Sequence, residues 1–223
     1  MKRKRKNKKR RRLVQNMRWC FGFLVLLAVM LGVTKYMSPH WESWKYFELS
    51  NAQIDASKPE INVDLLTVNP YSRPGTETGK INGIVIHYTA NPGSSAKANR
   101  DYFENLKDTH ITKTSSNFIV GIEGEIIQCV PTWEVAYASN QRNRDTVSIE
   151  CCHLDESGEF TKETYRSLVQ LTAWLCMKFE LDEKDVIRHY DVTGKNCPKY
   201  FVENESAWEG FQRDVRNALA NTE

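Results

Sequence analysis

Residues 81–88 read Ile-Asn-Gly-Ile-Val-Ile-His-Tyr (INGIVIHY), a stretch rich in β-branched side chains. Such residues favour strands because they pack well on a pleated surface. Gly79 precedes the stretch and Asn91-Pro92-Gly93 follows it, so turn-forming residues bound it on both sides. The pattern predicts a buried strand that ends at His87.

The chain downstream of this strand alternates between helical and extended patterns. Ser94 or Ser95 is a suitable cap for a helix that runs to about Lys107. Its expected apolar face consists of Ala98, Tyr102, Phe103 and Leu106. Two strands are then expected at residues 117–122 and 125–130, joined as a hairpin at Glu123-Gly124.

The remaining patterns complete an α/β domain. Residues 145–153 form an extended pattern, residues 161–180 a helical one that Thr161 can cap, residues 185–189 a short strand, and residues 206–220 a final helix. Strands and helices in this order predict a mixed central β-sheet packed by about three α-helices, with a single membrane helix preceding the domain.

The segment 188–198, RHYDVTGKNCP, concentrates groups that bind metals. His189 and Cys197 are eight residues apart, too far for one helical face but within reach of a strand end and a loop that folds back over it. His87 supplies a second imidazole. Two neutral imidazoles and a thiolate are good zinc ligands, and three protein ligands leave a fourth position for water.

Two further residues are candidates for the chemistry of such a site. Glu150 lies in the apolar strand pattern, where a carboxylate is costly unless it has a partner or a task. Lys195 is two residues before Cys197 and is a candidate for stabilising an oxyanion. The alternatives are structural: His87 as a hydrogen-bonded core residue, Glu150 in an ion pair with an arginine, and Lys195 as a solvated side chain. His40, His110 and His153 are likewise interpreted as hydrogen-bonded core or surface residues.

The cysteines argue against a disulfide framework. Cys20 belongs to an apolar segment, and the five others are Cys129, Cys151, Cys152, Cys176 and Cys197. An odd number leaves at least one thiol unpaired, and a chain of 223 residues needs no dense disulfide network. Cys129 and Cys176 fit buried free thiols, and Cys197 is the thiol nominated for chemistry.

The N-terminus carries the positive charge of the chain. Residues 1–18 hold eleven Lys or Arg and no acid, and without them 20 basic residues face 28 acidic ones. The acidic remainder gives no electrostatic reason to expect binding to nucleic acid. Residues 19–34 then contain no charge. A basic run before an apolar one is typical of a membrane-insertion signal whose positive side stays in the cytoplasm.

These features predict a basic cytoplasmic tail at 1–18, a transmembrane signal-anchor at 19–37, and a stalk or linker at 38–58. No small-residue cleavage site follows Leu31, which favours an uncleaved anchor in the cell membrane, with secretion after signal cleavage as the alternative. The folded domain is expected at 59–223, on the extracellular side.

From about Ile81 to Val215 the chain resembles the zinc-dependent N-acetylmuramoyl-L-alanine amidases of type 2, which share a fold with peptidoglycan recognition proteins. The resemblance rests on IVIHYTAN, SSNFIVGIEGEIIQCVP, SIECCH and RHYDVTGKNCP in this order. It implies that His87, His189 and Cys197 bind Zn²⁺, that Glu150 is the general base or orients water, and that Lys195 stabilises the oxyanion. It also implies a zinc amidase catalytic domain at 59–223.

The resemblance implies a cell-wall hydrolase, expected to be a monomer, that cleaves the amide between N-acetylmuramic acid and L-alanine in peptidoglycan. Phage members have a tyrosine beside the metal where this chain has Ser115-Ser116-Asn117. Without that tyrosine, catalysis by this chain is expected to depend on Glu150. One alternative is a module that binds peptidoglycan without cutting it. Another is a disulfide-stabilised scaffold ectodomain, in which Cys197 would form a disulfide.

Overall fold

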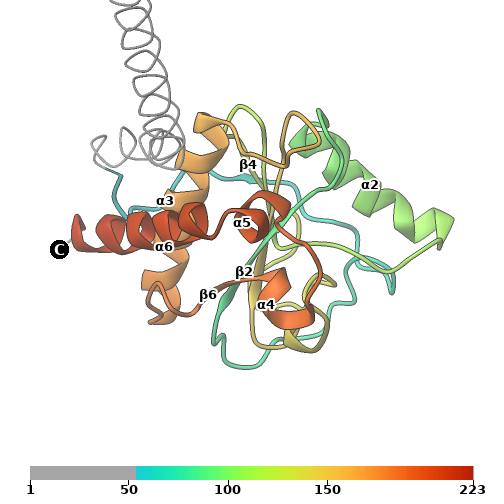
Figure 1. Ribbon diagram of the computed structural model, residues 1–223. Helices are drawn as coiled ribbons and strands as arrows, with labels where there is room; N and C mark the ends of the chain where they lie inside the picture. Colours follow the sequence, from blue (N-terminus) through green and yellow to red (C-terminus); the bar gives the residue numbers. More distant parts are fainter. Residues whose placement is uncertain (1–53, 223) are drawn as a thin grey trace, which may run out of the picture. The chain divides into compact units, whose positions relative to one another are not determined.

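The computed structural model describes residues 54–222, which form a mixed six-stranded sheet with helices on both faces (Figure 1). The strands are β1 (Asn62–Val63), β2 (Ile84–Tyr88), β3 (Phe118–Val120), β4 (Ile126–Gln128), β5 (Val147–Cys151) and β6 (Val186–Arg188). Their order across the sheet is β1-β4-β3-β5-β2-β6. The predicted mixed central sheet is therefore confirmed.

The centre of the sheet is parallel. β2 lies between β5 and β6 and runs parallel to both, while β3 is parallel to β5 and antiparallel to β4. The register places His87 opposite Glu150 and Ile86 opposite Arg188. Because parallel strands end at the same edge of a sheet, the residues that close β2, β5 and β6 meet there.

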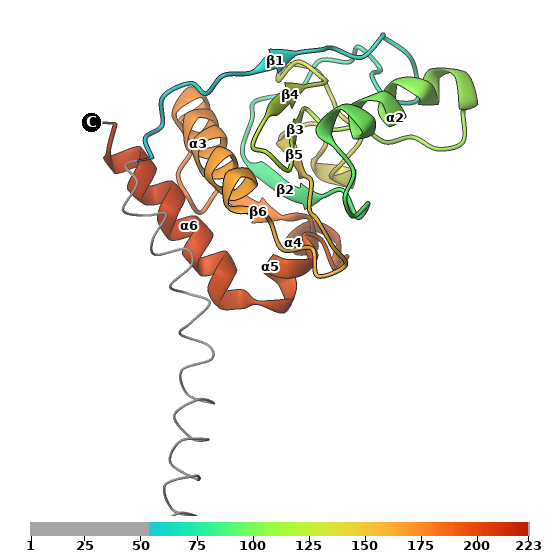
Figure 2. The ribbon, with the colours of Figure 1, turned by 90° about the horizontal axis from the view of Figure 1, so that it is seen from above.

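The helices form a layer on each face of the sheet. α2 (Ala96–Thr109) covers one face, and α3 (Lys162–Phe179) packs with α6 (Glu205–Ala220) on the other (Figure 2). Two short helices, α4 (His189–Thr193) and α5 (Lys199–Glu203), follow β6, and a 3₁₀ turn, η1 (Asn140–Arg142), precedes β5. The five α-helices of the described residues include the three expected from the sequence, at 96–109, 162–179 and 205–220.

Each face has its own apolar core. Under α2 the core combines residues of the helix with residues of β3, β4 and the loops around them: Leu66, Ala96, Phe103, Ile119, Ile127, Cys129, Val130, Ala136 and Cys152. Under α3 and α6 the core is aromatic. The ring of Phe211 lies 5.4 Å from that of Phe201 and 5.5 Å from that of Trp208.

The predicted apolar face of α2 is partly wrong. Phe103 and Leu106 are buried, but Ala98 and Tyr102 are exposed, and Ala96 and Asn99 are buried instead. Ala98 and Tyr102 each precede a buried position by one residue. A step of one residue rotates a side chain by about 100° around the helix axis, away from the packed face.

The strand expected to carry His189 ends one residue earlier than predicted. Arg188 is the last residue of β6 and His189 the first of α4. Asp191 causes the helix to begin there, because its carboxylate accepts a hydrogen bond of 2.8 Å from the backbone N–H of Arg188. The segment expected to be a loop therefore begins with a short helix, and α4 and α5 exceed the predicted number of about three.

Residues 54–58, which the sequence placed in the linker, pack against the end of α6. Ile54 and Ala56 are buried. The backbone N–H of Ala56 donates to Oγ1 of Thr222, and the side chain of Asn221 donates to the carbonyl of Ile54. These contacts add residues 54–58 to the folded unit.

Between residues 54 and 222, no helix has both the length and the apolar composition needed to cross a bilayer. The predicted transmembrane segment at 19–37 and the basic tail at 1–18 lie outside the described residues.

We expect Phe211→Ala to lower the free energy of unfolding by about 3–5 kcal/mol, because it removes a fully buried ring from the aromatic core. Denaturant unfolding followed by circular dichroism measures this change. Met177→Ala on α3 is the control, since Met177 is 51% exposed and its truncation should change stability by no more than about 0.5 kcal/mol. Equal losses in both variants would contradict the assignment of the core.

Candidate metal centre

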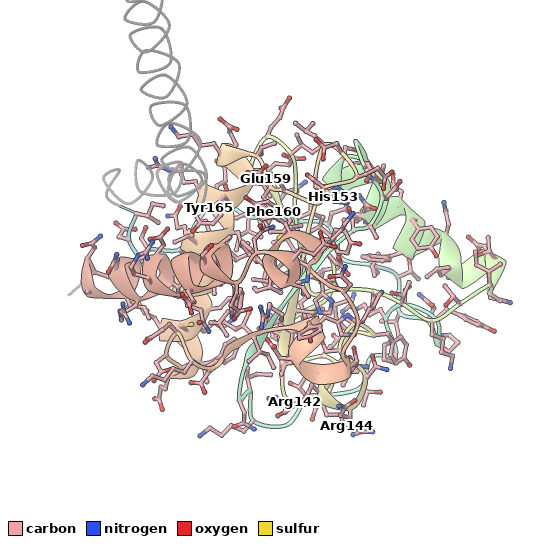
Figure 3. All side chains as sticks on the ribbon, viewed as in Figure 1. Arg142, Arg144, His153, Glu159, Phe160 and Tyr165 are labelled. Atoms are coloured by element: carbon pink, nitrogen blue, oxygen red, sulfur yellow. The ribbon has the colours of Figure 1, made fainter. Side chains whose placement is uncertain are left out.

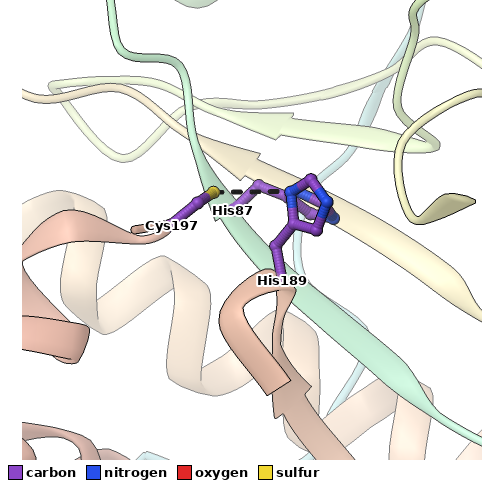
Figure 4. A group of neighbouring side chains, drawn as sticks. All are labelled: His87, His189 and Cys197. Carbon is purple, nitrogen blue, oxygen red and sulfur yellow. Dashed lines mark hydrogen bonds between the residues drawn. The ribbon is translucent and has the colours of Figure 1, made fainter. Parts of the chain in front are cut away.

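Three donor side chains converge at the carboxyl edge of the parallel strands (Figure 4). Ile86 of β2 pairs with Arg188 of β6, so the residues that follow them, His87 within β2 and His189 at the start of α4, lie side by side. Their ring centroids are 4.6 Å apart. The sulfur of Cys197 lies 3.9 Å from Nδ1 of His87. Potential ligand atoms of the three residues all lie within 4.8 Å of one another, and all three side chains are buried.

Cys197 reaches this group because the chain folds back after α4. Gly194 ends the helix at φ 76°, a left-handed conformation that glycine adopts without steric cost, and its N–H donates to the carbonyl of Tyr190. The N–H of Tyr190 in turn donates to the carbonyl of Cys197 at 2.9 Å. This bond holds the thiol beside the first turn of α4. The peptide bond from Cys197 to Pro198 is cis.

The side chain of Arg188 anchors the junction of β6 and α4. Its guanidinium is nearly buried, donates to both carboxylate oxygens of Asp191, and donates to Oε2 of Glu205 and the carbonyl of Phe201. Hydrogen bonds between charged groups are among the stronger ones in proteins. The position of His189, the next residue, is therefore fixed from α4, α5 and α6 at once.

Two buried polar atoms at the centre lack a hydrogen-bond partner in the protein, namely Nδ1 of His189 and Oε2 of Glu150. Such atoms are rare in folded proteins and point to an ion or water. Ligand atoms around one tetrahedral zinc are about 3.4–3.6 Å apart, so the donor atoms, which lie within 4.8 Å of one another, would move closer together when an ion binds. The His–His–Cys group therefore fits a zinc ion.

The electrostatics favour neutral imidazoles. Burial lowers the pKa of His87 well below its usual range, and the charges of His189 and Lys195 lower it further. Burial and the Lys195 charge also lower the pKa of His189. Burial raises the pKa of the Cys197 thiol to about 12, and the nearby carboxylate of Glu150 raises it too. A cation is thus needed to stabilise the thiolate, and its binding would release a proton.

Glu150 lies on β5 directly opposite His87, with Oε1 4.0 Å from Nδ1 of the histidine. Burial raises the pKa of Glu150 to about 8, and the positive charge of Lys195 lowers it. Lys195 is exposed in the turn between α4 and Cys197, near enough to influence the pKa of Glu150 and of the donor groups. The five residues expected from the sequence therefore occupy one region of the structure.

The other described histidines lie outside the donor group. His110 is exposed and stacks on Tyr71. His153 is buried beside Tyr88, and its Nδ1 lies 2.7 Å from the carbonyl of Asp155. Figure 3 shows it across the domain from Arg142, which precedes β5. Neither histidine belongs to the donor group, and His40 lies outside the described residues.

The five described cysteines are all buried and free, including Cys197. The expectation of buried free thiols at Cys129 and Cys176 is confirmed. The structure gives no support to a scaffold in which Cys197 forms a disulfide, because its sulfur is directed at the two histidines.

Residues 115–117 occupy the segment where phage amidases have a tyrosine, and in this chain the side chains of Ser116 and Asn117 hydrogen-bond to neighbouring strands. The hydroxyl oxygen of Ser116 lies within hydrogen-bond distance of two acceptors, the carbonyls of Phe118 and Ser148, at 2.9 and 3.0 Å. The side-chain oxygen of Asn117 accepts from the backbone N–H of Ser148, at 3.0 Å. These bonds join the start of β3 to β5, so the two residues stabilise the sheet that carries Glu150.

Two residues next to the histidines were not predicted from the sequence. Oγ of Ser139 lies 3.1 Å from Nε2 of His87, and Oδ1 of Asn140 lies 3.4 Å from Nε2 of His189. Both residues belong to a polar, aperiodic segment that carries no motif. The only available signal was a cluster of turn-forming residues just before the strand of Glu150.

The sheet and the donor group define an α/β protein with three buried side chains that could hold a metal ion. A family model described as N-acetylmuramoyl-L-alanine amidase matches residues 77–200, a range that contains all five site residues. The chain therefore belongs to this amidase family, which confirms the resemblance seen in the sequence.

Similar proteins of known name and similar solved structures agree with this family assignment. The chain is 34% identical over 170 residues to N-acetylmuramoyl-L-alanine amidase CwlL of Bacillus licheniformis, covering 71% of this chain and 47% of the relative. It thus spans about half the length of that relative. The catalytic domain of XlyA is 26% identical with a TM-score of 0.60, covering 70% of this chain and 99% of the domain. PlyL shares the fold, with a TM-score of 0.62 at 22% identity over 72% of this chain and 99% of PlyL.

We expect the full-length protein to retain zinc after dialysis and Cys197→Ala to lose it, because the variant removes one of three ligands. Metal content measured by atomic emission tests this. Cys176→Ala is a matched control, since Cys176 is also a buried free thiol but lies outside the donor group. Equal zinc content in both variants would disprove the proposed ligand set.

Proposed function

We propose that this chain is a zinc-dependent N-acetylmuramoyl-L-alanine amidase, which hydrolyses the amide between the lactyl group of N-acetylmuramic acid and L-alanine in peptidoglycan. The observation that carries the proposal is the convergence of His87, His189 and Cys197 beside Glu150, whose Oε2 is buried without a partner in the protein. Membership of the family supports the choice of reaction. Proteins named as amidases are among its relatives.

In this proposal His87, His189 and Cys197 hold the zinc ion. The ligands would be two neutral imidazoles and a thiolate, which are common zinc donors, and they leave one coordination position open. Zinc bound in this way polarises a carbonyl and lowers the pKa of a water molecule towards about 7. The same residues exclude solvent from the inner side of the site, since all three are buried.

Glu150 is proposed as the general base and acid. Its Oε2 is buried without a protein partner, and is therefore free to accept the proton of the attacking water and to deliver it to the leaving amine. A carboxylate in water has a pKa of about 4 and is a weak base. Burial raises the pKa of Glu150, and adjacent positive charge moderates that rise, which brings its basicity closer to the range useful near neutral pH.

Lys195 is proposed to face the substrate. Its side chain is exposed in the turn before Cys197, and its charge acts on Glu150 and on the three donor residues. A positive group near the scissile carbonyl favours the transition state, in which negative charge develops on the carbonyl oxygen. The chain lacks the tyrosine that phage members have near Ser116, so the proposed proton transfers rely on Glu150.

We further propose the cellular arrangement that the N-terminal sequence favours. Residues 1–18 would remain in the cytoplasm and residues 19–37 would anchor the chain in the cell membrane. The linker predicted at 38–58, of which residues 54–58 pack against the folded domain, would connect the anchor to an extracellular catalytic domain. In this arrangement a monomer would meet peptidoglycan outside the membrane. Release from the membrane by signal cleavage remains the alternative arrangement.

Incubation of the full-length protein and zinc with defined muropeptides tests the reaction, with the products identified by mass spectrometry. We expect new free amino groups on L-alanine and peptide-free N-acetylmuramic acid. Cleavage between amino acids of the stem would make the protein a peptidase instead. Binding of muropeptides without cleavage would favour the non-catalytic binding module.

We expect Glu150→Gln to lower kcat by about 10²–10⁴-fold, because the amide cannot accept the proton, while zinc content stays at the parent level. The substitution conserves shape and removes a costly buried charge, so it should not unfold the domain. Glu123→Gln, at an exposed position in the β3–β4 turn, is the matched control and should keep parental activity. Parental kcat in Glu150→Gln would remove Glu150 from the mechanism.

A further inference from the structure

One short turn contacts both histidines of the centre. Ser139 and Asn140 are consecutive residues at the start of η1, yet they lie 52 and 49 positions away from the histidines they meet. Oγ of Ser139 is 3.1 Å from Nε2 of His87, and Oδ1 of Asn140 is 3.4 Å from Nε2 of His189. Ser139 is only 1% exposed. In His87 this contact is made by the ring nitrogen opposite the one that lies 3.9 Å from the sulfur of Cys197, and in His189 by the ring nitrogen opposite the unpartnered Nδ1.

We propose that the turn at Ser139 and Asn140 is a positioning element that fixes the tautomer and the ring orientation of both histidines. This inference rests on the proposed function, because it assumes that the histidines bind a metal. In it, each histidine carries its proton on Nε2 and presents Nδ1 to the metal.

The hydrogen-bonding groups determine this choice of tautomer. The amide oxygen of Asn140 can only accept, so the Nε2 that bonds to it carries the proton. Nδ1 of His189 then holds a lone pair, and it is the buried ring nitrogen without a partner. For His87, Nδ1 lies 3.9 Å from the sulfur of Cys197. Binding through that nitrogen requires the proton on Nε2, where the hydroxyl of Ser139 accepts it.

The turn is fastened to the elements that carry the catalytic groups. The side-chain oxygen of Asn143 accepts from the backbone N–H of Ala138 and of Ser139, at 3.1 and 2.5 Å. The side chain of Gln141 donates to the carbonyl of Val192 in α4, the helix that begins with His189. The turn therefore keeps its place relative to one of the ligands it contacts.

The far end of the turn is held to the strand that carries Glu150. The guanidinium of Arg142 bonds to Asp145 at 2.8 Å, and the hydroxyl of Thr146 donates to the carbonyl of Arg142. Thr146 directly precedes β5. A displacement of the turn would consequently disturb both histidine contacts and the start of β5 together.

The backbone at Asn140 is specialised for this contact. Its φ angle is 52°, in the left-handed region that most residues avoid and that asparagine enters more readily than most. Asn140 is exposed, so burial of its side chain does not explain this conformation. The conformation directs the amide to His189, and a glycine at the same position would keep the backbone while removing the acceptor.

The test measures zinc affinity of the full-length protein by competition with a chromophoric chelator. Ser139→Ala and Asn140→Gly should each weaken binding about 10–100-fold, the range typical for loss of a partner to a metal-bound histidine. Ser139→Thr keeps the hydroxyl and should recover most of the affinity. Ser206→Ala and Glu180→Gly are matched controls at exposed positions of α6 and of the α3 end, the latter also with a positive φ of 58°, and should bind as the parent does.

The absorption bands of the cobalt-substituted protein give a second readout, because they respond to ligand geometry. We expect the bands to shift in Ser139→Ala and Asn140→Gly while circular dichroism of the metal-free proteins is unchanged. If Ser139→Ala fails to fold, Asn140→Gly alone decides the question, since it alters an exposed side chain and keeps the left-handed backbone conformation.

The outcomes separate this inference from the proposed function. Failure of the parent protein to bind zinc would refute the metal centre itself. Parental affinity and parental cobalt spectra in both Ser139→Ala and Asn140→Gly, with zinc bound normally by the parent, would refute the positioning role and leave the metal centre intact.

Discussion

The parallel pairing of β5, β2 and β6 is the constraint on which the rest of the site depends. Because the strands run in one direction, their last residues meet at one edge of the sheet. The register then sets Glu150 opposite His87 and brings His189 next to it. A shift of one residue in β2 would turn the imidazole to the other face of the sheet, since side chains alternate along a strand. The position of the candidate metal ligands is therefore a property of the strand register.

This edge of the sheet concentrates polar groups in a buried place, and the surrounding structure compensates for them. Nδ1 of His189 and Oε2 of Glu150 have no partner within the protein, which is unfavourable in the absence of a metal ion and water. Stability is supplied elsewhere, by the aromatic core beneath α3 and α6 and by the bonds of Arg188 to Asp191 and Glu205. Unsatisfied groups of this kind are expected where function, rather than stability, determines the residue.

Much of the fold was readable from local patterns. The helix at 161–180 was recognised within a residue at each end, because Thr161 caps it and its apolar residues recur at helical spacing. The hairpin at 117–130 followed from two strand-like segments joined by the turn signal Glu123-Gly124, although its strands are shorter than expected. Boundaries and faces were less accurate, as for Ala98 and Tyr102, because packing partners from distant segments decide which side of a helix is covered.

The sequence by itself determined the types of residue at the site, since two histidines, a cysteine, a glutamate and a lysine appear in segments typical of this amidase family. Only the tertiary structure decided which nitrogen of His87 lies beside Cys197 and which residues contact the two rings. Ser139 and Asn140 carry no motif, and they approach His87 and His189 solely because η1 is fastened to α4 and to the start of β5. Contacts between residues about fifty positions apart depend on the path of the whole chain, which no local pattern encodes.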